Sequence, residues 1–215
     1  MESPGKRPYS STVRAESARR TRGAIVSAAT RLFVEGGYEG TSLEDVARAA
    51  GVARPTVTAT FGSKDALLAE VLDQALAGDD APVPVRERPW FQPVWSATTA
   101  EDVLDAYAAV CVTIARRAAP VVEAVHRATD SHPQISALWE RWLAGRRAGA
   151  AMVVEREVLR RRLRPGLDVE AAIDVLWILN DPGSYALIVQ RRGWSEDRFQ
   201  RWLASSMRAL LLDDR

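Results

Sequence analysis

The chain has 215 residues, a net charge of +1 from 29 basic and 28 acidic side chains, and a single cysteine. This length is enough for one or two domains with buried cores, and the near-neutral charge gives no sign of a nucleic-acid partner by itself. The lone Cys111 excludes an internal disulfide framework and a cysteine zinc cluster. No apolar run approaches the ~18–20 residues of a membrane span, and the polar start lacks a signal-peptide core, so we expect a cytoplasmic protein.

The start of the chain is basic. Residues 1–22 hold six Lys and Arg residues against two Glu residues, a local excess of four positive charges. We expect residues 1–19 to form a flexible basic arm, which can lie near phosphates or in a minor groove. An ordinary solvated tail explains the same composition equally well.

An amphipathic helix is predicted after this arm, and a short helix follows it. The apolar face of the first consists of Ile25, Ala28, Ala29, Leu32 and Phe33. Thr41 is placed to cap the short helix, and Glu44, three residues on, completes a capping box. Gly51 can take the left-handed conformation that ends this helix.

A second short helix is predicted from about Arg54, because Pro55 fits the first turn of a helix. Ser63 then lies in the stretch 62–65 that ends this helix and caps the next one. Two short helices joined by a tight glycine turn form a helix-turn-helix, whose second helix can lie in the major groove of DNA. Residues 41–67 therefore predict a DNA-binding unit.

Motif positions across residues 20–70 resemble one known family. These positions are 37–42, 45–47, 50–52, Thr56 and 61–67. In this register the segment resembles the N-terminal DNA-binding domain of TetR-family (tetracycline-repressor-like) transcriptional regulators. The resemblance implies an all-α fold, with an N-terminal three-helix helix-turn-helix domain over residues 20–77. A helical ligand-binding and dimerisation domain follows over residues 78–215.

The resemblance also implies a function. Regulators of this family bind a near-palindromic DNA operator as homodimers and respond to a small-molecule effector, most often as repressors. The sequence has no glycine-rich phosphate loop after a strand, no G-x-S-x-G and no H-E-x-x-H, so we expect neither an enzyme nor a cofactor. The expected partners are double-stranded DNA, an effector and a second copy of the chain.

The DNA contacts of the family carry over by position. Arg54, Thr56 and Thr58 match base-reading positions, and Thr41, Ser42 and Lys64 match phosphate-contacting positions. The arginine suits a bidentate contact to guanine, and a threonine methyl group can meet the methyl group of thymine. A role as helix caps alone is the alternative for Thr41 and Ser63.

The recognition helix also departs from the family pattern. Ala53 stands where a serine usually opens the helix, and Thr58, Ala59 and Thr60 stand where a tyrosine and a histidine or second aromatic residue are common. Part of the usual phosphate clamp is therefore missing. The alternative function is a ligand- or partner-binding helical protein with a degenerate DNA-binding domain.

The rest of the chain reads as helices separated by proline and glycine breaks. The expected elements are a proline-rich loop over 78–96, helices over 98–118, 120–130, 131–159 and 168–191 with an interruption at 181–183, and a last helix capped by Ser195. Asp168 is expected to cap the helix that it begins.

Aromatic residues are frequent in this second half. The residues expected to line a ligand pocket are Tyr107, Trp139, Trp142, Trp177, Asn180 and Tyr185. Aromatic walls with a few polar anchors suit an apolar ligand, although the same tryptophans could simply fill a helical core. Cys111 lies on an apolar helix face and is interpreted as an inert buried thiol. The spacing of His126, Asp130 and His132 favours a solvated turn over a metal site.

The last helix carries a regular apolar stripe. Phe199, Leu203, Met207 and Leu210 are its members, and with the segment 168–191 they are expected to form the interface of a two-fold homodimer. The alternative is that both segments pack inward on their own chain.

Overall fold

The computed structural model describes residues 9–213, which form helices and no strand, so the predicted all-α class is confirmed. The chain divides into two compact units, the first ending at Val71 and the second starting at Leu72. Helix α4 (Lys64–Ala77) continues through this boundary. No helix among the described residues is long and apolar enough to cross a membrane.

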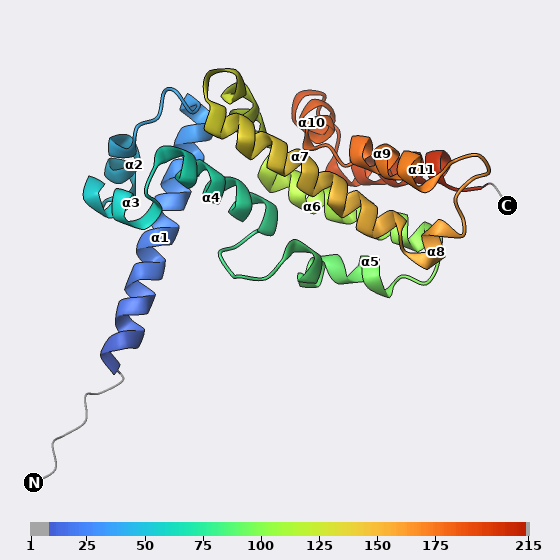
Figure 1. The fold of residues 1–215 in the computed structure, drawn as a ribbon, viewed down its shortest axis with the longest axis horizontal. Helices are drawn as coiled ribbons and strands as arrows, with labels where there is room; N and C mark the ends of the chain where they lie inside the picture. Colours follow the sequence, from blue (N-terminus) through green and yellow to red (C-terminus); the bar gives the residue numbers. More distant parts are fainter. Residues whose placement is uncertain (1–8, 214–215) are drawn as a thin grey trace, which may run out of the picture. The chain divides into compact units, whose positions relative to one another are not determined.

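The first unit contains α1 (Tyr9–Gly36), α2 (Leu43–Ala50), α3 (Arg54–Phe61) and the beginning of α4 (Figure 1). Its core is apolar and fully buried, with Ile25, Phe33, Val46, Val57, Leu67 and Leu68 as its main members. Helix α1 begins ten residues earlier than the predicted arm would end. The expected flexible arm is thus corrected over residues 9–19, and residues 1–8 lie outside the described part.

The cap of α2 differs from the expected one by a single residue. Ser42 is the N-cap, and its hydroxyl accepts a hydrogen bond from the backbone N–H of Asp45. The carboxylate of Asp45 accepts in return from the Ser42 N–H, so the capping box is formed by this pair instead of Thr41 and Glu44. The capping-box pattern fits both registers in the sequence, and the burial of Thr41 decides between them.

The second unit is built around α6 (Ala100–Arg127), which contacts α5 (Gln92–Ser96), α7 (Pro133–Val154), α10 (Pro182–Tyr185) and α11 (Glu196–Leu211). A break was expected at Pro120, but α6 continues through it. A proline inside a helix costs about 3 kcal/mol. The neighbouring residues Ala118, Ala119, Val121 and Val122 are all buried, and this packing offsets the cost.

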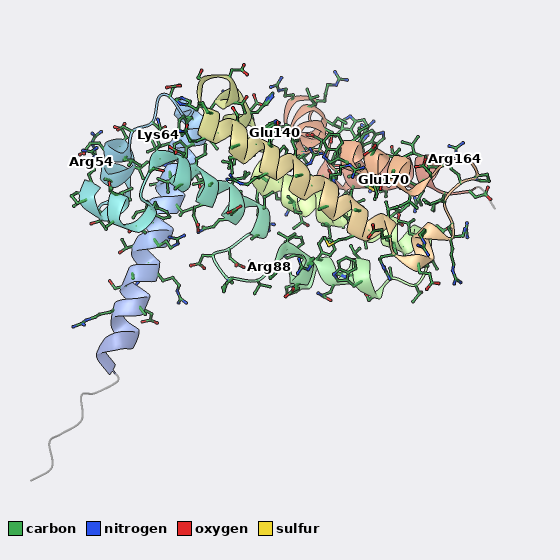
Figure 2. The ribbon with its side chains drawn as sticks, in the orientation of Figure 1. Arg54, Lys64, Arg88, Glu140, Arg164 and Glu170 are labelled. Carbon is green, nitrogen blue, oxygen red and sulfur yellow. The ribbon has the colours of Figure 1, made fainter. Side chains whose placement is uncertain are left out.

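The segment 78–96 was expected as a loop but contains short helical turns. These are η1 (Val85–Glu87), η2 (Pro89–Phe91) and α5. Arg88, labelled in Figure 2, is 4% exposed and holds the segment together, because its Nη1 donates to the Asp79 carboxylate at 2.6 and 2.7 Å and its Nη2 donates to the Ala81 carbonyl. Phe91 and Val94 are buried in the core of the second unit, so tertiary packing converts a proline-rich stretch into ordered turns.

The chain after α6 consists of short and long helices. Helix α7 ends at Val154, five residues before the predicted end, and the remaining elements are η3 (Thr129–Ser131), α8 (Glu157–Arg160), α9 (Val169–Leu179), α10, the π-helical turn η4 (Ala186–Arg191) and α11. Asp168 and Ser195 cap α9 and α11 through hydrogen bonds from Ala171 N and Arg198 N, as the sequence predicted. Helix α9 contacts both α7 and α11.

Replacement by alanine is expected to have opposite effects on stability at two glycines of the second unit. Gly145 lies inside α7, and a Cβ built on it meets no heavy atom within 4 Å. Gly145→Ala is therefore expected to raise the free energy of unfolding by about 0.5–1 kcal/mol, since alanine loses less backbone entropy in a helix. Gly166 has a φ of +84°, so the same substitution there should destabilise the chain. Urea denaturation of both variants checks the two signs, and a destabilised Gly145→Ala would contradict the expectation.

Candidate nucleic-acid interface

The turn between α2 and α3 has the geometry of a helix-turn-helix. Gly51 takes the left-handed conformation (φ 67°, ψ 31°) and ends α2. The Val52 N–H donates to the Ala47 carbonyl at 3.0 Å, which closes the helix end. Helix α3 then begins at Arg54 with Pro55 in its first turn, as predicted, and it packs against α2.

Helix α3 has one buried side and one exposed side. Val57 is completely buried and anchors the helix to the core of the first unit. Arg54 and Thr58, one helical turn apart, are exposed, whereas Thr56 is half-buried. The guanidinium of Arg54 has no hydrogen-bond or ion-pair partner among the described residues, and it lies at the outer edge of the first unit (Figure 2). The exposed side therefore presents one cation and one hydroxyl one turn apart.

The start of α3 has no side-chain cap. Ala53 is the N-cap residue and makes no side-chain hydrogen bond to the first turn. Pro55 has no N–H, and the Thr56 N–H donates to the Ala53 carbonyl at 2.9 Å. Of the first three residues of α3, only Arg54 therefore has an N–H left for an anion. The alanine that departs from the family pattern thus leaves this one N–H open to a phosphate.

Thr41 does not present its hydroxyl to a partner outside the chain. Its side chain is 3% exposed, and the hydroxyl donates toward the carbonyls of Leu32 and Gly37 at 3.1 and 2.9 Å. The expected phosphate contact by this side chain is therefore corrected to a structural role at the end of α1. Ser42 is exposed, but its hydroxyl already donates to the Asp45 carboxylate at 2.6 Å while capping α2.

Lys64 links the start of α4 to the turn between α1 and α2. Its Nζ donates to the carbonyls of Tyr38 and Thr41 at 2.9 and 3.0 Å, and it lies 4.0 Å from the centre of the Tyr38 ring. The Tyr38 hydroxyl donates to Asp65 at 3.1 Å, and burial with this contact raises the pKa of Tyr38 well above its usual value. The sequence did not predict this cluster, because its members are about 25 residues apart.

Lys64→Met is expected to lower the free energy of unfolding by about 1–2 kcal/mol, because two carbonyls lose a charged donor that is only partly buried. Urea denaturation measures the change. Arg48→Met is the matched control: Arg48 is exposed, and its ion-pair partner among the described residues is Asp45, three residues earlier, so its loss should cost a few tenths of a kcal/mol at most. Equal stability of the Lys64 variant and the parent would contradict the structural role.

Arg22 positions α3 from the side of α1. Its guanidinium pairs with Glu70 on α4 at 2.6 Å and lies 4.6 Å from the centre of the Phe61 ring at the end of α3. A single side chain thus contacts α3 and α4 at once. The sequence placed Arg22 among the basic residues at the start of the chain, but only the tertiary fold brings it to Phe61.

The residues expected to form a ligand pocket are partly brought together in the second unit. Trp142, Trp177, Asn180 and Tyr107 surround Arg146, which the sequence analysis did not single out. Trp139 extends the group by lying 4.6 Å from Trp142, ring centre to ring centre. Burial lowers the pKa of Arg146 from its very high usual value.

Tyr185 faces a different set of partners. Its hydroxyl donates to Glu196, its ring packs edge-to-face on Phe199, and Glu196 is paired with Arg116. Cys111 is buried, and burial raises the pKa of its thiol to about 12, in agreement with an inert thiol. Within the described residues no group of three His, Cys, Asp or Glu side chains could hold a metal ion, and His126 instead stacks on Trp139.

The stripe expected at a dimer interface is mostly internal. Phe199, Leu203 and Met207 are at most 1% exposed and belong to the core of the second unit, where α11 packs on α6. This part of the expected interface is therefore wrong, and the inward-packing alternative is correct for these three residues. Leu210 is 46% exposed and remains available to a partner.

Comparison with known proteins tests which protein family this helix-turn-helix resembles. The family model described as "Bacterial regulatory proteins, tetR family" matches residues 25–71, which include α2, the glycine turn and α3. Residues 25–71 therefore form a segment of the TetR-family type. Its resemblance to that family, first apparent from the sequence motifs, is thereby confirmed, and the family consists of DNA-binding transcription factors rather than enzymes.

Solved structures resemble this chain over nearly its whole length. NalD, the secondary repressor of the MexAB-OprM multidrug efflux pump in Pseudomonas aeruginosa, is 25% identical with a TM-score of 0.69, over 93% of this chain and 100% of NalD. A transcriptional regulator from Rhodococcus sp. Rha1 is 18% identical with a TM-score of 0.62, over 88% of this chain and 95% of that one. The second likeness concerns the fold alone. No curated protein matches the chain.

Proposed function

We propose that this chain is a TetR-family repressor that binds a near-palindromic operator as a homodimer and is controlled by a small-molecule effector in the cytoplasm. Residues 20–77 form the DNA-binding domain and residues 78–215 the effector and dimerisation domain. The observation that carries the proposal is the exposed side of α3, where Arg54 has no partner among the described residues. A buried Val57 behind it holds the helix in place.

The exposed side of α3 carries side chains that can contact the edge of a base pair. An arginine free of internal partners can donate two parallel hydrogen bonds to guanine, and one turn later Thr58 offers a methyl group and a hydroxyl. The uncapped start of α3 adds the Arg54 N–H for a phosphate. Repression is supported by the likeness to NalD, which is itself described as a repressor.

The homodimer is proposed to form through exposed side chains of the second unit, in place of the buried stripe of α11. The largest exposed apolar side chains of α9, η4 and α11 are Ile178, Leu187, Trp202 and Leu210, with Ile178 66% exposed. On α11, Trp202, Ser205 and Ala209 share one exposed face at a spacing of i, i+3 and i+7, and the two small residues permit close approach of a second helix. Because α9 and α11 contact each other, these side chains belong to neighbouring elements of one unit.

The proposal is tested by DNA binding with the full chain. A gel shift with the DNA upstream of the chain's own gene, in excess random competitor, should give a specific complex. A footprint of that complex should cover two related half-sites whose centres lie about 34–36 Å apart or a multiple of it. Equal affinity for upstream and random DNA would favour the alternative, a helical binding protein with a degenerate DNA-binding domain, which the Thr58-Ala59-Thr60 segment suggests.

A further inference from the structure

The cluster around Arg146 has more hydrogen-bond donors than acceptors. The Nε1 atoms of Trp142 and Trp177 are buried and have no hydrogen-bond partner among the described residues. Trp142 is only 6% exposed, so water does not easily replace a partner for its N–H. A buried donor without an acceptor is costly, and two of them in one cluster call for an explanation.

Both indoles lie against the same guanidinium. The Cζ atom of Arg146 is 4.8 Å from the ring centre of Trp142 and 5.7 Å from that of Trp177. Arg146 stands one helical turn after Trp142 on α7, while Trp177 comes from α9. The two unpartnered N–H groups therefore belong to rings that share one positively charged neighbour.

The acceptors already present in the cluster are in use. Asn180 Oδ1 accepts from Arg146 Nε and Nη2 at 3.1 and 2.8 Å, and the Trp177 carbonyl accepts from Nη2 at 2.6 Å. The Asp181 carboxylate accepts from Nη1 at 2.9 Å, but its side chain is 44% exposed and lies at the edge of the cluster. The Tyr107 hydroxyl accepts from Asn180 Nδ2. Among the described residues of the cluster, these contacts leave buried donors, and no buried acceptor, without a partner.

There is also space beside these groups. Gly149 lies on α7 seven residues after Trp142 and three after Arg146, on the same side of the helix. A Cβ built on Gly149 meets no heavy atom within 4 Å. Gly149 is partly exposed, so the side of α7 that carries the indole and the guanidinium has an open position at the surface.

We propose that this cluster is a binding site for a planar aromatic carboxylate. The aromatic part packs against the Trp177 indole and over Gly149, since Arg146 and Trp139 already lie against the Trp142 ring. The carboxylate accepts hydrogen bonds from the two indole N–H groups beside Arg146. An anion suits this position because the nearest full charge is the guanidinium and its own carboxylate partner reaches toward solvent. The inference deepens the proposed function, since it rests on that function for the claim that the ligand is an effector.

Three ligands with the same ring system test the chemical class. Isothermal titration of the full chain compares 2-naphthoate with naphthalene-2-carboxamide and 2-naphthylmethylammonium. The carboxylate should bind at least about tenfold more tightly than the amide, because hydrogen bonds to a charged group are the stronger ones. The ammonium compound should not bind beside Arg146. Equal affinity for carboxylate and amide, or no binding of 2-naphthoate, would overturn the proposal.

Single-residue variants locate the site. Trp142→Phe keeps the aromatic ring and removes the N–H, so 2-naphthoate should bind about tenfold more weakly while the thermal midpoint of the unliganded chain stays the same or rises. Trp95→Phe is the matched control, because its indole N–H already donates to the Arg86 carbonyl and lies outside the cluster. Its affinity for 2-naphthoate should equal that of the parent. Unchanged binding by Trp142→Phe would place the ligand elsewhere.

A second variant guards against misfolding of the first. Gly149→Leu fills the open position and should abolish binding of 2-naphthoate while the far-UV circular dichroism is unchanged. Retained binding by this folded variant would count against the site. The proposed regulatory function is measured separately, by the gel shift with and without 2-naphthoate. Specific DNA binding without any binding of 2-naphthoate would contradict the proposed ligand site but not the proposed DNA-binding function. Binding of 2-naphthoate that leaves the DNA affinity unchanged would contradict the role of the ligand as an effector.

Discussion

Replacing Arg54 with alanine is expected to weaken binding to the specific operator by about 1–3 kcal/mol while changing binding to random DNA much less. The side chain is exposed and has no partner among the described residues, so its removal is expected to leave the free energy of unfolding unchanged. A bidentate contact to one guanine is lost, and discrimination at that base pair should relax. Quantitative gel shifts on the operator, on an operator changed at that base pair and on random DNA measure the effect.

A phosphate contact would behave differently from a base contact. If Arg54 only neutralised a phosphate, its loss would weaken all sequences alike and lower the salt dependence of binding by about one counterion. That result would contradict the assignment to base reading. Arg160→Ala is the matched control, because this exposed arginine on α8 belongs to the second unit and its loss removes the same charge. Its operator affinity should equal that of the parent.

Local features of the fold could be predicted from the sequence because their causes are local. Gly51 ends α2, Pro55 opens α3, and Ser63 caps α4 through a bond from the Ala66 N–H at 3.2 Å, all within four residues of the position that requires them. The caps Asp168 and Ser195 were predicted on the same basis. In each case a backbone geometry or a short side chain decides the result, and no distant residue competes.

Other features depend on distant residues and were mispredicted. Pro120 normally breaks a helix, but the burial of its neighbours on α6 overrides this preference. The periodicity of α11 identified an apolar face without specifying its neighbour, which proved to be α6 of the same chain.

The candidate sites show the same difference between features with local causes and features that depend on distant residues. The exposure of Arg54 on α3 agrees with its predicted position on the DNA-facing side, because the helix-turn-helix pattern is short and specific. The internal roles of Thr41 and Lys64 were missed, since the atoms they contact come from α1 and the following turn. Arg146 was missed for a similar reason: it becomes conspicuous only when α9 brings Trp177 and Asn180 beside it.

Charge placed on the exposed face of α9 and α11 is expected to split the proposed homodimer without unfolding the chain. Ile178→Glu with Leu210→Glu puts two carboxylates on side chains that are 66% and 46% exposed and lie outside the core cluster of the second unit. In a symmetric dimer each substitution occurs twice, and burying four unpaired carboxylates is strongly unfavourable. Sedimentation at micromolar concentration should change from dimer to monomer, with unchanged circular dichroism.

Splitting the dimer should also remove most of the operator affinity, by about 10²-fold or more, because a monomer engages one half-site and loses the gain from linking two. Val83→Glu is the matched control: this side chain is 39% exposed and lies in the segment after α4, outside the proposed face, so this variant should stay a dimer. A charge at Leu203 is a different test, because that side chain is buried and its replacement should unfold the second unit instead. If the double variant sediments like the parent and binds the operator equally well, the second copy does not bind at this face.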